Sequence, residues 1–128
     1  MDSLQFEQQA TQDPHISAFL REVAEDAAQD IAIEEPQRFI TVTGVDLLLG
    51  LVAYALYRLV KDSLDHRRAL HEVDIAEQQA QVIADLIDAG FPPKDAQAAA
   101  VALLKGIAKR TGDDPVLKKV STLVGKAQ

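Results

Sequence analysis

The feature that most constrains this sequence is an apolar segment at residues 39–60. Eleven consecutive residues from Leu47 to Tyr57 carry no charge, and single charges at Asp46 and Arg58 flank them. A helix that is apolar on every side must be hidden from water, either inside a protein or within a bilayer. The rest of the fold therefore has to cover this segment, or a membrane must.

The composition indicates one folded domain whose core is built from aliphatic residues. Of the 128 residues, 48% are hydrophobic and 5% are aromatic. That hydrophobic fraction is too high for a disordered chain, and the length is sufficient for a sizeable core. Because the sequence has no cysteine, it contains no disulfide, thiolate nucleophile or zinc–thiolate site.

The net charge of −7 is concentrated in the N-terminal third of the chain. Residues 1–38 contain nine acidic and two basic residues, whereas residues 79–128 contain five acidic and seven basic ones. An acidic chain lacks the basic surface that neutralises phosphates, so we expect no nucleic-acid partner. The asymmetry suits head-to-tail contact between copies or orientation across a membrane, although such charges also simply solvate outer helix faces.

Periodic apolar stripes predict an all-α fold with four to five helices. Residues 1–12 are polar and acidic, which predicts a flexible arm. A single helical domain is expected over residues 13–128. Asp13 can cap the first helix, Pro14 suits its first position, and an acidic amphipathic helix is predicted over residues 13–35.

The middle of the sequence predicts a long apolar helix over about residues 44–62, packed by the amphipathic helices. No proline occurs between residues 44 and 89, so residues 44–89 form either one continuous helix or a helix pair. Thr43 and Asp46 have the spacing of a capping box at the start of this helix.

The C-terminal part predicts a helical hairpin over residues 94–126, after a corner at which Gly90 closes the preceding helix in a left-handed conformation. A helix that ends in Gly90-Phe91, followed by a short helix rich in small residues and a third helix, resembles the ubiquitin-associated type of three-helix module. The resemblance covers about the last 50 residues. Ala89 stands where that family often has methionine, and no binding residues are carried over.

The sequence contains no recognisable catalytic, cofactor-binding or metal-binding motif. The serines lack a Gly-flanked nucleophile elbow, and there is no glycine-rich phosphate loop. The best polar cluster is formed by Asp62, Asp65, His66 and His71, but the two histidines lie about 140° apart around a helix, so they do not share a metal easily. We therefore expect no enzyme activity, cofactor, metal ion or small-molecule substrate.

These patterns predict a non-enzymatic helical assembly or adaptor protein that acts by helix packing and self-association. Five leucines are expected to carry the packing: Leu47, Leu48, Leu51, Leu56 and Leu59. Burying about ten side chains of this kind, at about 1.5–3 kcal/mol each, would make the apolar helix the dominant stabilising element. Another hypothesis is a soluble regulator that binds a partner through the helical unit at residues 90–126.

A membrane-penetrating protein is the alternative, with residues 39–60 in the bilayer. Four basic residues follow the segment and would keep the C-terminal part cytoplasmic: Arg58, Lys61, Arg67 and Arg68. Against this hypothesis, a helix from Val45 to Val60 spans about 24 Å, less than the bilayer core of about 30 Å. The expected location is therefore the cytoplasm, or a membrane with the C-terminal part cytoplasmic, and the expected partners are copies of the chain or other helical proteins.

Overall fold

The computed structural model describes residues 3–34, 42–65, 75–109 and 115–125, and all regular secondary structure in these ranges is helical. The described ranges contain six helices: α1 (Ser3–Gln12), α2 (Pro14–Glu34), α3 (Val42–Asp65), α4 (Ile75–Asp88), α5 (Pro93–Ala108) and α6 (Pro115–Gly125). The all-α fold class is confirmed. The expected number of four to five helices is wrong for the described part of the chain, because the N-terminal residues form a helix of their own.

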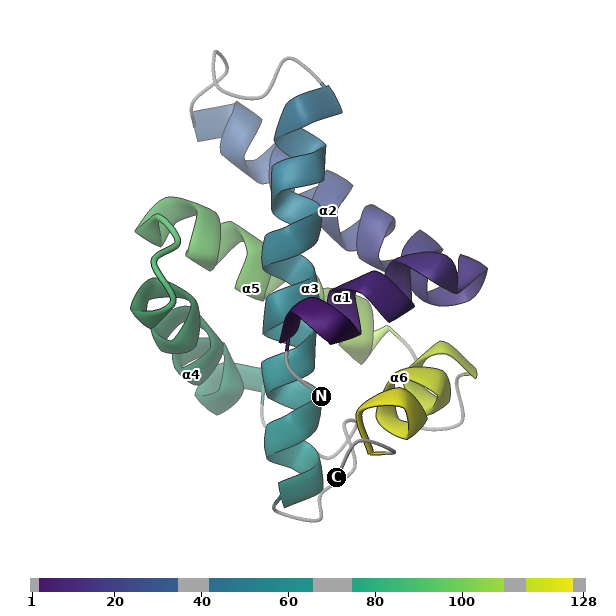
Figure 1. The fold of residues 1–128 in the computed structure, drawn as a ribbon. Coiled ribbons are helices and arrows are strands. Elements are labelled where there is room, and N and C mark those ends of the chain that lie inside the picture. The colour runs from purple at the N-terminus through teal and green to yellow at the C-terminus, as the bar shows by residue number, and fades with distance from the viewer. Residues whose placement is uncertain (1–2, 35–41, 66–74, 110–114, 126–128) are drawn as a thin grey trace.

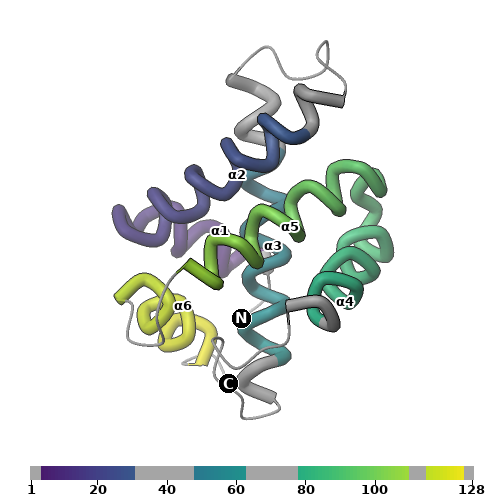
Figure 2. The backbone as a smooth tube through the Cα atoms, turned by 180° about the vertical axis from the view of Figure 1, so that it is seen from behind, coloured from purple at the N-terminus to yellow at the C-terminus, as the bar shows by residue number. Residues whose placement is uncertain are grey.

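Helix α3 is the axis of the molecule, and the other helices surround it (Figure 1). It contacts each of the other five helices, and α2 and α5 also pack against each other. Helices α4 and α6 lie on opposite sides of α3, as the front and back views agree (Figures 1 and 2). The buried apolar side chains of all these helices belong to a single core.

The apolar segment is covered by helices of its own chain. Leu48, Leu51, Leu56 and Leu59 are between 0% and 3% exposed. The predicted need to hide this helix is therefore met inside a single copy. Within the described residues, we find no helix whose length and apolar character would let it span a bilayer.

The helical run at residues 44–89 is a helix pair and not one continuous helix. Arg58 of α3 and Asp85 of α4 form an ion pair, with 4.0 Å between Nε and Oδ2. In a continuous helix these two residues would be separated by about 40 Å. The chain therefore folds back on itself between α3 and α4, and the intervening residues 66–74 lie outside the described ranges.

Helix α1 replaces the flexible arm that was predicted for residues 1–12. Phe6 and Ala10 are fully buried, and the ring centroid of Phe6 lies 5.7 Å from that of Tyr57 in α3. The expectation rested on the polar composition of the segment. It overlooked that two apolar residues four apart lie on the same face of a helix and can dock it on a core.

The predicted start of α2 is confirmed. The Oδ1 atom of Asp13 accepts hydrogen bonds from the backbone N–H groups of His15 at 2.9 Å and Ile16 at 3.1 Å. Pro14 occupies the first helical position, where its missing N–H needs no partner. These bonds satisfy two of the amides that a helix N-terminus leaves free.

The predicted left-handed corner at Gly90 is also confirmed, with a φ of 99°. The N–H of Gly90 donates to the carbonyl of Ile87 at 3.0 Å, and the N–H of Phe91 donates to the carbonyl of Leu86 at 3.1 Å. This pair of bonds is a Schellman motif. The ring centroid of Phe91 then lies 5.9 Å from that of Tyr54, so the corner is held against α3.

Helices α5 and α6 do not pack together as the predicted hairpin at residues 94–126. The main contacts of α5 are with α2, α4 and α3, whereas those of α6 are with α3 and α2. The last three helices therefore share the core of the whole chain. They do not form the separate three-helix unit that the resemblance to the ubiquitin-associated module implied.

Candidate interaction site

The leucines predicted to drive assembly lie in the interior of one chain. Leu48, Leu51, Leu56 and Leu59 are all buried among helices of the same copy, while the side chain of Leu47 lies outside the described part. Buried side chains cannot contact another molecule unless the domain opens. Any contact between copies must therefore use other residues.

The basic residues that follow the apolar segment have partners within the chain where the structure describes them. Arg58 pairs with Asp85, and the Nζ atom of Lys61 lies 5.9 Å from the ring centroid of Tyr57, a cation–π arrangement. Arg67 and Arg68 lie outside the described residues. Arg58 thus links α3 to α4, whereas Lys61 contacts an aromatic ring of its own helix.

The polar cluster near the end of the apolar helix is only partly within the described ranges. Asp62 is half-buried near the end of α3, and His66 and His71 lie outside. Among the residues that the structure describes, no group of three or more His, Asp or Glu side chains could hold a metal ion.

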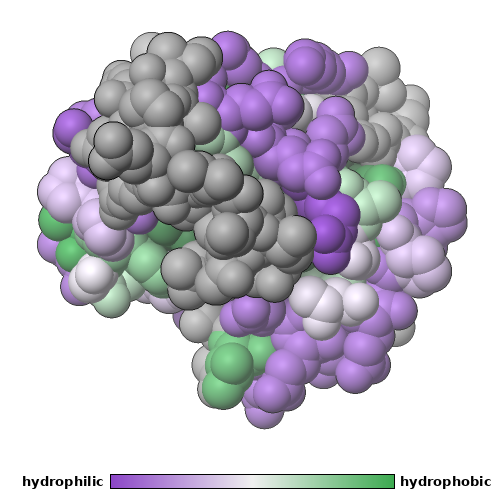
Figure 3. Space-filling view, turned by 90° about the horizontal axis from the view of Figure 1, so that it is seen from above, coloured by the Kyte–Doolittle hydropathy of each residue, from purple (hydrophilic) through white to green (hydrophobic). Residues whose placement is uncertain are grey.

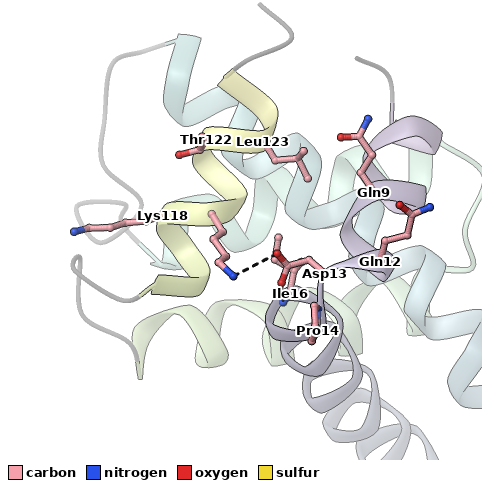
Figure 4. A pocket seen from close by; sticks show the side chains of 9 residues that line it. Gln9, Gln12, Asp13, Pro14, Ile16, Lys118, Thr122 and Leu123 are labelled. Carbon is pink, nitrogen blue, oxygen red and sulfur yellow. Dashed lines mark hydrogen bonds and ion pairs between the residues drawn. The ribbon is translucent and has the colours of Figure 1, made fainter.

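A groove opens between α6 and the corner where α1 meets α2 (Figure 4), with a volume of about 700 Å³. Three helices contribute its lining: Gln9 and Gln12 from α1, Asp13 at the corner, Pro14 and Ile16 from α2, and Lys118, Lys119, Thr122 and Leu123 from α6. The volume lies within the range of about 300–1,000 Å³ that is typical of ligand pockets.

The floor of this groove is apolar and its rim is polar. Ile16 is 2% exposed, and Leu123 is partly buried and points from α6 toward α1 (Figure 4). Gln9 and Gln12 are exposed on the facing wall. A buried apolar centre with a polar rim is the usual construction of a protein–protein contact.

An ion pair joins the two walls of the groove. The Nζ atom of Lys119 lies 3.5 Å from Oδ2 of Asp13, while the side chain of Lys118 is directed away from Asp13 (Figure 4). The pKa of Asp13 is lowered, chiefly by the N–H of Ile16, with smaller contributions from His15 and Lys119. Asp13 thus caps α2 and also links the corner to α6.

A second apolar feature lies on the opposite side of the molecule, along the outer face of α4. Ile87 is 42% exposed, and in the described ranges only Leu4, at 61%, is another exposed large hydrophobic residue. Ala80 and Ala84 are exposed and Ile83 is partly buried. Their spacing of three and four residues places these side chains on one stripe of the helix.

Most of the described surface is hydrophilic on the face shown in Figure 3, where exposed hydrophobic side chains form small separate groups. Scattered apolar residues of this kind are normal on monomeric proteins. The described part of this face has no broad apolar area of the kind that obligate dimers bury.

The comparisons with known proteins leave the groove as the main guide to function. No protein-family model, curated protein or solved structure matches this chain. The groove and the exposed side chains of this chain therefore provide the basis for its function.

Sequence reasoning did not find the groove. The sequence identified Asp13 as a helix cap and predicted apolar stripes on the helices, but no pattern connected Asp13 with Ile16 and Leu123. The ion pair between Asp13 and Lys119 joins residues that are distant in sequence. Stripe periodicity identifies which face of each helix is apolar, but it carries no signal for where two such faces stop short of full contact.

Proposed function

We propose that this chain is a non-enzymatic helical interaction module that acts by self-association. The groove beside α6 is the observation that supports the proposal, because it offers an apolar floor to a side chain from outside the molecule. The buried α3 has a supporting role. It holds the helices that form the groove walls, since α1, α2 and α6 all contact it.

The charge distribution favours contact between copies of this chain. The exposed acidic residues of the N-terminal third include Glu25, Asp26 and Asp30, whereas Lys118 and Lys119 are exposed on α6. Opposite charges on two patches of one surface attract when two copies meet, which raises the association rate and favours particular orientations. The small apolar groups on the surface are consistent with transient association, since weak complexes bury less than about 1,200 Å².

Sedimentation velocity over a concentration series tests this proposal. We expect the average mass to rise between micromolar and millimolar protein, and the rise to diminish in high salt because rim charges are screened. A strictly monomeric mass across the whole series would refute self-association.

A second candidate is a regulator that binds a partner helix through residues 90–126. It is favoured by the fact that α6 supplies one wall of the groove. Removing residues 89–128 is not a clean test, because Ala99 and Leu103 of α5 belong to the core. A better test measures binding of acidic amphipathic peptides to the intact chain and to a variant with a more acidic groove rim. This candidate predicts a monomer whose peptide binding is lost in the variant.

A further inference from the structure

We propose that the groove receives the C-terminal end of α4 from a second copy of this chain. Ile87 would insert between α6 and the α1–α2 corner, and Asp88 would lie at the basic rim. This inference rests on the proposed self-association and identifies the two surfaces that meet.

The outer face of α4 has the shape that such an insertion requires. Ile87 projects into solvent near the end of the helix, and Ala84, one turn earlier, is also exposed. Small residues beside a large one let another helix approach closely while the large side chain enters a recess. The apolar floor at Ile16 and Leu123 is the matching recess, because an insertion there removes the exposed side chain of Ile87 and the exposed part of Leu123 from water.

The charges on the two surfaces are complementary. Asp88 is exposed beside Ile87, whereas the nearby Asp85 is already paired with Arg58. The groove is lined by two bases from α6, Lys118 and Lys119, and Lys119 also pairs with Asp13. Rim charges of opposite sign mainly set the orientation and the rate of association, while the buried apolar contact supplies most of the affinity.

Leu4 fits the groove less well than Ile87, although it is more exposed. Its neighbours on the exposed face of α1 are uncharged, as Gln8 and Thr11 show. The carboxylate of the nearby Glu7 is directed to α3, where one of its oxygens lies 3.4 Å from the position that a Cβ on Gly50 would take. Among the described residues, the surface around Leu4 therefore offers less negative charge to the basic rim of the groove than Asp88 does.

The positions of the two surfaces determine the kind of assembly. Helices α4 and α6 lie on opposite sides of α3 (Figures 1 and 2), so α4 cannot reach the groove of its own copy. The contact between copies joins different surfaces, and each copy keeps one free groove and one free α4 end. Such head-to-tail contacts produce rings or growing chains and do not stop at a two-fold dimer.

The first test replaces Ile87 by Lys and compares it with Leu4→Lys, the same change at the other exposed hydrophobic residue. Ile87→Lys should keep the fold, because the site is exposed and a basic residue suits the last turn of a helix. We expect it to weaken association by about tenfold or more, as loss of a central interface residue does. Leu4→Lys should leave association unchanged. Both are measured by sedimentation velocity, with thermal melts to verify folding.

The second test mixes two defective copies. The double variant Gln9→Glu with Lys118→Glu has an acidic groove rim but an unchanged α4, whereas Ile87→Lys has an unchanged groove. Each should be monomeric when alone, and an equimolar mixture should form a complex of one copy of each that grows no further. This result is specific to a head-to-tail contact between these two surfaces.

The outcomes separate this inference from the proposed function. If the wild-type chain associates and Ile87→Lys associates equally well, the contact is wrong while self-association stands. Reversing Glu25 and Asp26 should slow association without abolishing it. A loss as large as that of Ile87→Lys would overturn the contact, because it would place the acidic face of α2 in the interface. A monomeric wild-type chain would refute both proposals.

Discussion

Helix α2 meets two other helices in different ways, and the contrast explains where this molecule is closed and where it is open. Against α5 the contact is tight: a Cβ placed on Gly106 would lie 3.2 Å from Phe19 Cε2 and from Val23 Cγ2. Near its N-terminus, α2 faces α6 across a groove that Lys119 spans to reach Asp13. Small residues let helices approach closely, whereas long polar side chains keep them apart.

The same contrast separates the core from the proposed interaction site. Residues in the tight contacts have no room and no access to solvent, so their changes act on folding. Side chains on the rim of the groove, unlike the buried Ile16 of its floor, are exposed or partly exposed, so their changes act on what binds there. Substitutions in the core should therefore change stability, and substitutions on the groove rim should change association.

Leu51→Asp should unfold the domain, because Leu51 is 3% exposed and belongs to the apolar core. Placing an unpaired charge or an unsatisfied polar group in a core costs several kcal/mol, out of a total stability of about 5–15 kcal/mol. Circular dichroism and thermal melting measure the loss. Thr122→Asp in the groove rim is the control and should melt close to the wild-type temperature. A wild-type melting temperature for Leu51→Asp would contradict the packing of α3.

Gly106→Ala should destabilise the protein by about 1–2 kcal/mol, because crowding of Phe19 and Val23 outweighs the better helix propensity of alanine. Gly50→Ala is the matched control within a helix. Its Cβ would meet only Glu7 Oε1 at 3.4 Å, so it should stabilise by up to about 1 kcal/mol. Chemical denaturation of both variants checks the signs. Equal effects at the two glycines would show that α2 and α5 are not closely packed.

Gly90→Ala should destabilise by about 1–2 kcal/mol, because alanine is strained at a φ of 99°. No heavy atom outside the local chain lies within 4 Å of an added Cβ, so the cost is conformational and not steric. Gly90→Asn is the comparison, since asparagine tolerates the left-handed region better. In denaturant titrations, the free energy of unfolding should therefore be highest with Gly at position 90, lower with Asn and lowest with Ala. A different order would contradict the Schellman motif at this corner.

Asp13→Asn should have the smallest effect, because asparagine still caps α2 but loses the ion pair with Lys119. The pKa of Asp13 is lowered below the ordinary value of 3.8, so its stabilising contribution is complete above that pH and is lost as the pH falls through the folded-state pKa. The melting temperatures of wild type and Asp13→Asn should therefore differ at neutral pH and converge in acid. A difference that persists unchanged in acid would contradict this pairing.

The accuracy of the sequence-based predictions depended on how local the responsible interaction is. Asp13-Pro14 and Gly90 were placed correctly because their hydrogen bonds join residues two to five positions apart. Residues 1–12 were misjudged because the helix there is held by Phe6 on Tyr57, a contact with another helix. The C-terminal hairpin was misjudged for the same reason, since α5 and α6 dock elsewhere in the core.

The sequence alone specified an all-helical chain, the start of α2 at Asp13-Pro14, the end of α4 at Gly90, and the requirement that residues around Leu51 be hidden. These properties follow from side-chain periodicity and from hydrogen bonds within a few residues. Only the tertiary structure decided that helices of the same chain cover α3, that Arg58 meets Asp85, and that a groove remains beside α6. Periodicity specifies which face of a helix avoids water, but the partner for that face is chosen by the packing of all six described helices together.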